Sequence, residues 1–132
     1  MAAWSGLVVD DSPIFRRAVC ELFTHEAGFR VCAEAENGRD AVEKAKRYRP
    51  DIIVTDLFMP LMNGFEETRI LRKLMTNVPV IACSIQIDAQ IEREALAAGA
   101  SAFLSKSDAA LTLISTAHRL LEERDLVEGI AA

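Results

Sequence analysis

The stretch "DIIVTDLFMPLMNG", residues 51–64, joins an apolar run to a segment rich in turn-forming residues. The run is rich in β-branched residues and is apolar on both alternating faces, which is typical of a strand buried within a parallel sheet. One carboxylate, Asp56, ends the run, and a Met-Pro pair and an Asn-Gly pair follow. Proline and Asn-Gly interrupt regular structure. We therefore predict a central strand that carries Asp56 to one edge of a sheet, where the chain turns away.

Short apolar runs alternate with longer amphipathic segments along the whole chain. Strands are predicted at residues 6–10, 29–35, 51–56, 79–84 and 102–106. Helices are predicted at residues 13–28, 39–48, 65–75, 88–99 and 108–125. Strict alternation with wholly apolar strands predicts an α/β fold: a doubly wound, five-stranded parallel sheet between two layers of helices. The expected strand order is 2-1-3-4-5, the flavodoxin-like arrangement with right-handed crossovers.

Local signals support these helices and indicate which side chains they bury. Ser12 and Asp88 are placed to cap the first and fourth helices, while Gly28 and Gly99 are placed to end them. The inner face of the first helix is predicted to comprise Ile14, Phe15, Ala18, Val19, Leu22 and Phe23. The inner face of the third helix is predicted to comprise Phe65, Leu71, Leu74 and Met75.

Length and composition predict one compact domain. The chain has 132 residues, of which 51% are hydrophobic and 27% charged, so it can form a core. We expect a single domain over residues 1–132, with its core at about 6–123 and a short tail at 126–132. The net charge of −5 argues against nucleic-acid binding by this domain itself, since phosphates require clustered cations.

The cysteines and the apolar runs indicate a compartment. Three cysteines without CxxC spacing are expected to be reduced core thiols. The N-terminal sequence lacks the basic region of a signal peptide. No apolar run approaches the roughly 18 residues of a membrane span, so we expect no membrane contact and a cytoplasmic protein.

Polar residues follow the predicted strands at one edge of the sheet. Asp10 and Asp11 end the first strand, Asp56 the third, Ser84 the fourth and Lys106 the fifth. Sites in doubly wound sheets form beyond the carboxyl ends of the strands, so these side chains should converge. Three carboxylates repel one another, and a cation relieves the repulsion; an all-oxygen ligand set favours Mg²⁺. One carboxylate would then be free to attack a phosphoryl group, with the lysine neutralising its charge.

The same aspartates permit a simpler interpretation, in which each one caps a helix or solvates a loop. Any one of them alone would favour that interpretation. Their shared position at the ends of different strands favours a site.

These motifs resemble the receiver domain of two-component response regulators, the CheY-like fold. The resemblance rests on "LVVDDS", "DLFMPLMNG" and "ALAAGASAFLSK" and covers residues 6 to about 123. It implies that Asp56 accepts the phosphoryl group and that Lys106 contacts it. It implies Mg²⁺ held by Asp10, Asp11, Asp56 and the backbone carbonyl of Phe58. It also implies a switch built from Ser84 and Phe103.

The resemblance also implies partners. A histidine kinase or phosphotransfer protein would phosphorylate the domain, meeting part of the first helix near Ile14, Phe15 and Ala18. A homodimer through the helix 4–strand 5–helix 5 face, or through helices 1 and 5, is a further expectation. Residues 28–72 are similar to receivers of the NarL/FixJ/LuxR-type subfamily, which carry a DNA-binding domain, so transcription regulation is the expected output. The chain is expected to be a signalling switch, not a turnover enzyme.

The sequence departs from the family pattern at two places. Ser107 follows the lysine where many relatives have proline. Ile85 follows the switch hydroxyl where the family usually has a small residue, and Phe58 adds bulk near Asp56. We expect Ile85 and Phe58 to restrict access to the pocket and so tune how fast the phosphoryl group arrives or leaves.

Two other functions are alternatives for this sequence. One is an interaction module whose docking does not depend on Asp56. The other is a Mg²⁺-dependent phosphohydrolase, but such enzymes use a second aspartate two residues after the nucleophile, and Phe58 occupies that position.

Overall fold

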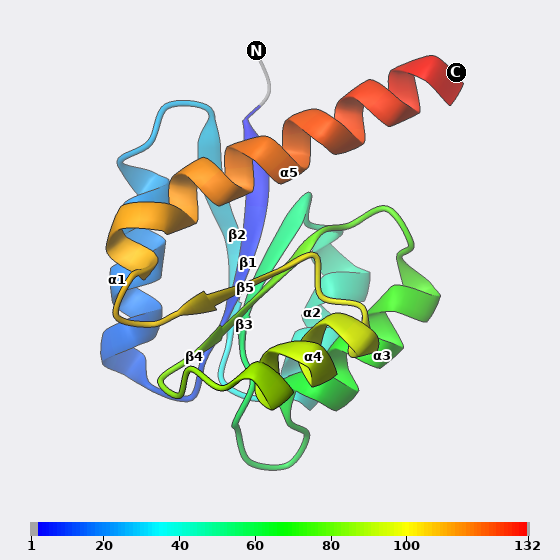
Figure 1. Ribbon diagram of the computed structural model, residues 1–132. Helices are drawn as coiled ribbons and strands as arrows, with labels where there is room; N and C mark the ends of the chain where they lie inside the picture. The colour runs from blue at the N-terminus through cyan, green and yellow to red at the C-terminus, as the bar shows by residue number, and fades with distance from the viewer. Residues whose placement is uncertain (1–2, 132) are drawn as a thin grey trace.

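The computed structural model describes residues 3–131, and the side chains of residues 3–129. Its strands are β1 (Trp4–Val9), β2 (Phe29–Ala35), β3 (Ile52–Asp56), β4 (Val80–Ser84) and β5 (Ala102–Ser105). Its helices are α1 (Pro13–Thr24), α2 (Gly38–Tyr48), α3 (Gly64–Leu74), α4 (Ala89–Ala98) and α5 (Ala109–Ala131). All strand pairs are parallel and their order is β2-β1-β3-β4-β5, which confirms the predicted fold class (Figure 1).

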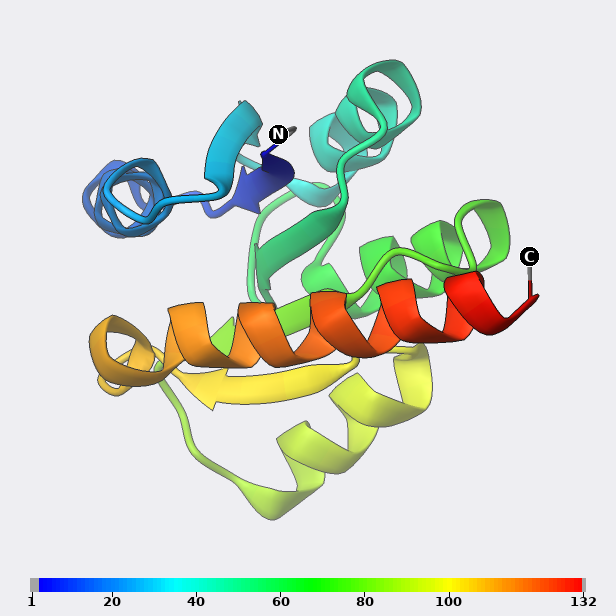
Figure 2. The same cartoon turned by 90° about the horizontal axis from the view of Figure 1, so that it is seen from above.

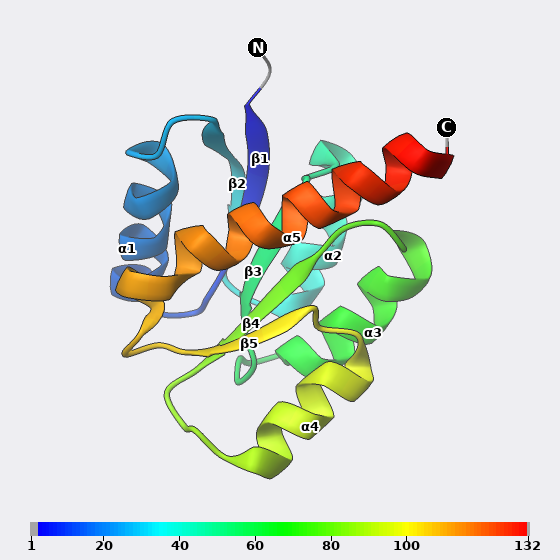
Figure 3. The same cartoon turned by 45° about the horizontal axis from the view of Figure 1, so that its top comes forward.

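Helices cover both faces of the sheet. Helices α1 and α5 pack on one face, and α2, α3 and α4 pack on the other (Figures 1 and 3). In Figure 2, α5 and α4 lie on opposite sides of β5. Successive strand residues face opposite layers. Val8 therefore joins the core under α1 and α5, while Leu7 and Val9 join the core under α2 and α3.

The capping signals predicted at Ser12, Asp88 and Gly99 are confirmed, but the one at Gly28 was wrong. Helix α1 ends at Thr24 with His25 as its cap, and Gly28, with φ of 89°, lies in the turn that follows. The side chains of Ser12 and Asp88 accept hydrogen bonds from the first turns of α1 and α4, and Pro13 occupies the first position of α1. Gly99 ends α4 with φ of 116°, a left-handed conformation that glycine adopts without steric cost. Two asparagines that were not predicted as caps, Asn37 and Asn63, cap α2 and α3 in the same way.

The predicted inner face of α1 was wrong in part. Val19 and Phe23 are buried, but Ile14 is 85% exposed and Ala18 is also exposed. A helix turns by about 100° per residue, so Ile14 points about 140° away from Val19. Six residues cannot all share one face at this spacing. In α3, Leu71 is buried but Leu74, the last residue of the helix, is 50% exposed.

The predicted tail at 126–132 was also wrong for the residues that are described. Helix α5 continues to Ala131, while Ala132 lies outside the described residues. No proline interrupts this segment, and Gly129 costs only about 1 kcal/mol in a helix interior. Leu126 and Val127 are 66% and 64% exposed on this extension.

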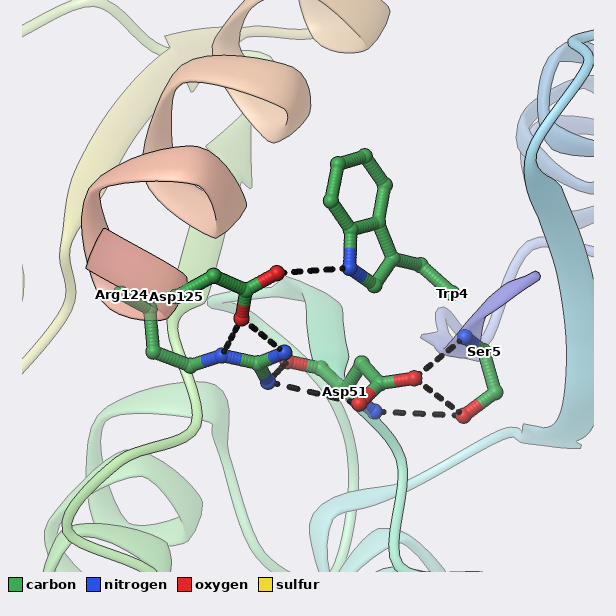
Figure 4. Close-up of polar contacts among 5 residues, drawn as sticks. All are labelled: Trp4, Ser5, Asp51, Arg124 and Asp125. Atoms are coloured by element: carbon green, nitrogen blue, oxygen red, sulfur yellow. Dashed lines mark hydrogen bonds and ion pairs between the residues drawn. The ribbon is translucent and has the colours of Figure 1, made fainter. Parts of the chain in front are cut away.

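A polar network holds α5 to the edge of the sheet where its strands begin (Figure 4). We call it the amino-edge network, and its members are Trp4, Ser5, Asp51, Arg124 and Asp125. Asp51 accepts hydrogen bonds from the backbone and hydroxyl of Ser5 at 2.8 and 3.2 Å. Arg124 donates to the Asp51 carbonyl at 3.1 Å and pairs with Asp125 at 2.8 Å. Trp4 Nε1 donates to Asp125 at 3.2 Å. The network thereby joins β1, the start of β3 and α5.

Within the described residues, no helix combines the length and apolar character that crossing a membrane requires.

Candidate functional site

Three carboxylates meet at the carboxyl edge of the sheet. Asp10 follows β1 and Asp56 ends β3, and these two strands are neighbours. Asp10, Asp11 and Asp56 each offer an oxygen within 4.8 Å of the others. Asp10 is 1% exposed and Asp56 6% exposed, while Asp11 faces solvent. The structure therefore brings together the three aspartates that the sequence placed at one edge.

The local backbone fixes the two buried carboxylates. The backbone N–H of Ser12 donates to Asp10 Oδ1 at 2.8 Å, and that of Phe58 donates to Asp56 Oδ1 at 3.3 Å. Beyond Asp56 the chain folds back tightly, so that a Cβ added to Gly64 would lie 2.2 Å from the Asp56 carbonyl oxygen. Only glycine fits there. Gly64 also donates to the Leu57 carbonyl at 2.9 Å, which closes the turn.

Lys106 supplies the positive charge of the pocket. Its backbone N–H donates to the Ser84 carbonyl at 2.8 Å, which fixes the segment beyond β5 against β4. Its Nζ lies 2.7 Å from Asp10 Oδ2 and 3.5 Å from Asp56 Oδ2, and its side chain is 12% exposed. The same Nζ lies 4.5 Å from the centre of the Phe15 ring. One ammonium thus faces two buried carboxylates and an aromatic ring.

Burial and crowding shift the titration of these groups. Burial, followed by the charge of Asp10, raises the pKa of Asp56 to about 6, although Lys106 opposes the shift. Burial alone would lower the pKa of Lys106, but its contacts with Asp10 and Asp56 raise it overall. At neutral pH the ionised pocket therefore holds more negative charge than its single ammonium compensates.

This donor set fits Mg²⁺. All three side chains offer carboxylate oxygens, the hard ligands that Mg²⁺ prefers, and the unrelieved charge favours a cation. The backbone carbonyl of Phe58 stays a predicted fourth ligand. When bound, Mg²⁺ would neutralise charge on the carboxylates and on a phosphoryl oxygen.

The predicted switch residues lie on the neighbouring strands β4 and β5. Ser84 ends β4 and is 1% exposed, and its Oγ accepts a hydrogen bond from the Gln86 backbone at 3.1 Å. Phe103, on β5, is partly buried and packs against the cluster of Leu57, Ala82, Ala95 and Ala100.

The two residues expected to restrict access are exposed. Ile85 is 81% exposed, and Phe58 is 50% exposed with its ring edge-on to Phe65 at 5.8 Å between centres. Their side chains therefore stand at the surface of the loops that follow β4 and β3. Their effect on access stays a prediction.

Glu67 is a buried acid that the sequence interpretation missed. It lies on α3, it is 0% exposed, and its Oε1 accepts a hydrogen bond from Thr55 Oγ1 at 2.7 Å. Burial raises the pKa of Glu67 to about 8; the Thr55 hydrogen bond lowers it and the charge of Asp56 raises it. Among the described residues, its Oε2 has no hydrogen-bond partner. The signal was present, because Glu67 stands one helical turn before the buried Leu71.

This fold and this acidic pocket define a CheY-like receiver domain. The family model described as "Response regulator receiver domain" matches residues 7–118, so the chain belongs to this family. Receiver domains bind Mg²⁺ at such a pocket and interact with histidine kinases or phosphotransfer proteins.

Individual relatives agree with the family assignment. The chain is 40% identical over 100 residues to chemotaxis protein CheY of Thermotoga maritima, which covers 76% of this chain and 82% of that protein. It is 38% identical over 108 residues to transcriptional regulatory protein DegU of Brevibacillus brevis, which covers 82% of this chain but only 46% of that protein. A LuxR-family response regulator from Aurantimonas sp. SI85-9A1 has a TM-score of 0.87 at 28% identity, over 98% of this chain and 96% of that one.

Proposed function

We propose that this domain is a phosphorylation switch in which Asp56 accepts a phosphoryl group from a histidine kinase or phosphotransfer protein. The supporting observation is the convergence of Asp10, Asp11 and Asp56 at the switch point of the sheet, with the Lys106 ammonium in contact with Asp10 and Asp56. The domain would promote its own phosphorylation and dephosphorylation without turning over a metabolite.

The chemistry follows from the positions of these groups. With its pKa at about 6, Asp56 is ionised at neutral pH and can act as a nucleophile. A carboxylate oxygen of Asp56 forms a bond to phosphorus while the bond from phosphorus to the donor's imidazole nitrogen breaks. Lys106, 3.5 Å from Asp56, is placed to pair with an oxygen of the transferring group. Hydrolysis later returns the carboxylate and releases phosphate.

The response would begin at Ser84. The phosphoryl group adds negative charge and hydrogen-bond acceptors. The Ser84 hydroxyl would move to donate to one of its oxygens, leaving its contact with Gln86. Phe103 would then repack within the cluster between β4, β5 and α4. A partner that reads the α4-β5-α5 face would distinguish the two packings.

Exposed apolar side chains around the pocket support docking of a phosphorylating protein. They follow the carboxyl ends of several strands and are Ile14, Phe58, Leu61, Ile85 and Ile87, exposed by 85%, 50%, 77%, 81% and 72%. Burying such side chains against an amphipathic helix would stabilise a complex and bring a histidine to Asp56.

The output we favour is transcription regulation, with homodimerisation through the α4-β5-α5 face or through α1 and α5. The similarity to DegU and to the LuxR-family regulator supports this output. We treat residues 1–132 as one receiver unit. A phosphorylation-independent interaction module is the second candidate. The exposed apolar side chains around the pocket favour it, because they are present at the surface without phosphorylation.

One experiment separates the two candidates. Partner binding would be measured for wild type and Asp56→Ala, each with Mg²⁺ and with or without beryllofluoride, a mimic of the phosphoryl group. A switch predicts that beryllofluoride changes binding by wild type and leaves binding by Asp56→Ala unchanged. Equal binding in all four samples would favour the module.

A further inference from the structure

The aromatic ring of Phe15, an uncharged residue of α1, contacts the ammonium of Lys106 in the acidic pocket. Phe15 is the third residue of α1, and its ring centre lies 4.5 Å from Lys106 Nζ. The face of an aromatic ring attracts a cation, and the attraction strengthens as water is excluded. With its side chain only 12% exposed, Lys106 is largely shielded from water.

A closed set of contacts fixes the ring relative to the ammonium. The backbone N–H of Ser12 donates to Asp10 Oδ1 at 2.8 Å, and the backbone N–H of Phe15 donates to Ser12 Oγ at 3.3 Å. Asp10 Oδ2 in turn lies 2.7 Å from Lys106 Nζ. The helix cap that positions Phe15 and the ammonium that Phe15 contacts are therefore held by the same carboxylate.

The other partners of Lys106 change their charge during the proposed reaction, whereas the ring does not. Asp56 is consumed as the nucleophile, and Asp10 fits a cation that would share its charge. Both attractions on the ammonium then weaken at the moment when it must pair with a phosphoryl oxygen. We infer that Phe15 is a positioning residue, which keeps the Lys106 ammonium over the pocket through this change.

The inference rests on the proposed phosphorylation of Asp56, and it competes with a purely structural role. Phe15 also packs against the core beneath α1 and α5. Leucine would preserve most of that packing but would remove the ring. Tyrosine would preserve both the packing and the ring face.

The test compares Phe15→Leu and Phe15→Tyr with wild type, using acetyl phosphate and Mg²⁺ as the small-donor probe. We expect Phe15→Leu to phosphorylate about tenfold more slowly, the fold-change typical of one desolvated cation–ring contact. Phe15→Tyr should stay within about twofold of wild type. Phe29→Leu is the matched control, since it makes the same substitution in the same core cluster but at the opposite edge of the sheet. It should phosphorylate at the wild-type rate.

A second readout does not need the reaction. In NMR spectra of the metal-free protein, the ring should shift the ε-methylene protons of Lys106 upfield in wild type and in Phe15→Tyr, but not in Phe15→Leu. Equal rates for Phe15→Leu and wild type, or unshifted protons in wild type, would overturn the inference. A wild type that cannot be phosphorylated at all would instead overturn the proposed function.

Discussion

Both edges of the sheet carry aspartates and one long cationic side chain, but the charges are paired at the amino edge and crowded at the carboxyl edge. At the amino edge, Asp51 receives N–H and O–H donors from Ser5 and pairs with Arg124 at 3.4 Å, and Arg124 also pairs with Asp125 (Figure 4). At the carboxyl edge, three carboxylates lie within 4.8 Å of one another, and the ammonium of Lys106 contacts only two of them, Asp10 and Asp56.

The difference shows which edge stabilises the fold and which one is built to react. Paired and hydrogen-bonded charges at the amino edge hold α5 to the strands. Crowded carboxylates at the carboxyl edge raise the free energy of the folded state until a cation offsets their charge.

The largest effect is expected at Glu67, beneath the carboxyl edge. Because its pKa is raised to about 8, the folded state keeps a proton that the unfolded state loses above its ordinary pKa. The stability of wild type should therefore fall as pH rises through this range. Glu67→Gln should be more stable than wild type by about 2–4 kcal/mol at pH 8 and nearly equal at pH 4. Urea unfolding at both pH values measures the difference.

Glu66→Gln is the matched control, since Glu66 is next to Glu67 in the sequence but its side chain is exposed. It should leave stability unchanged at both pH values. A Glu67→Gln variant that is less stable than wild type at pH 8 would show that this acid is ionised and paired.

The next effect tests the amino edge. Asp51→Ala removes the acceptor for Ser5 and the partner of Arg124. We expect a loss of about 2–3 kcal/mol, because donors to a charged acceptor are left unsatisfied. Thermal unfolding checks this, and Mg²⁺ should not restore the loss. An unchanged melting temperature would mean that the amino-edge network does not anchor α5.

Asp56→Asn should stabilise the folded state, whereas Asp51→Ala should destabilise it. The raised pKa of Asp56 means that its ionised form destabilises the folded state above pH 6, and this cost disappears as the pH falls toward 4. The variant should gain about 1–2 kcal/mol at pH 7.5, because one of the crowded charges is removed. Adding Mg²⁺ should stabilise wild type and so reduce the difference in free energy of unfolding between the two proteins. Destabilisation by Asp56→Asn would contradict the contrast between the edges.

The smallest effect concerns Ile85. Its side chain is 81% exposed beside the pocket, so it can hinder a small donor only partly. We expect Ile85→Ala to change labelling by acetyl phosphate by about two- to threefold, less than 1 kcal/mol in barrier. Quenched time courses of labelling and decay measure the change, and identical rates in both proteins would show that Ile85 does not restrict access to the pocket.

Much of this architecture could be predicted because the relevant signals are local. Apolar runs defined the strands, Ser12 and Asp88 marked helix starts, and the alternation of strands and helices predicted a parallel sheet, for which the flavodoxin-like strand order was expected. The site residues could be grouped because each stands at the same end of its strand. The carboxyl ends of parallel strands must share an edge.

The rest depended on tertiary packing, which sequence periodicity does not contain. Burial of Glu67 requires α3 to pack against Thr55, a contact between elements. The stacking of Phe15 on Lys106 joins the first helix to the segment after the last strand. The exposure of Ile14 reflects how α1 rotates against the sheet, and the hydrogen bond from Arg124 to the Asp51 carbonyl joins α5 to the residue before β3.

The most direct measurement would locate the phosphoryl group. Wild-type protein would be treated with acetyl phosphate with and without Mg²⁺, and the acyl phosphate would be trapped by borohydride reduction before peptide mass spectrometry. We predict modification at Asp56 alone, dependent on Mg²⁺, with Asp51 at the opposite edge unmodified in every sample. Labelling elsewhere, or labelling that does not need Mg²⁺, would contradict the assignment of the carboxyl edge as the reactive one.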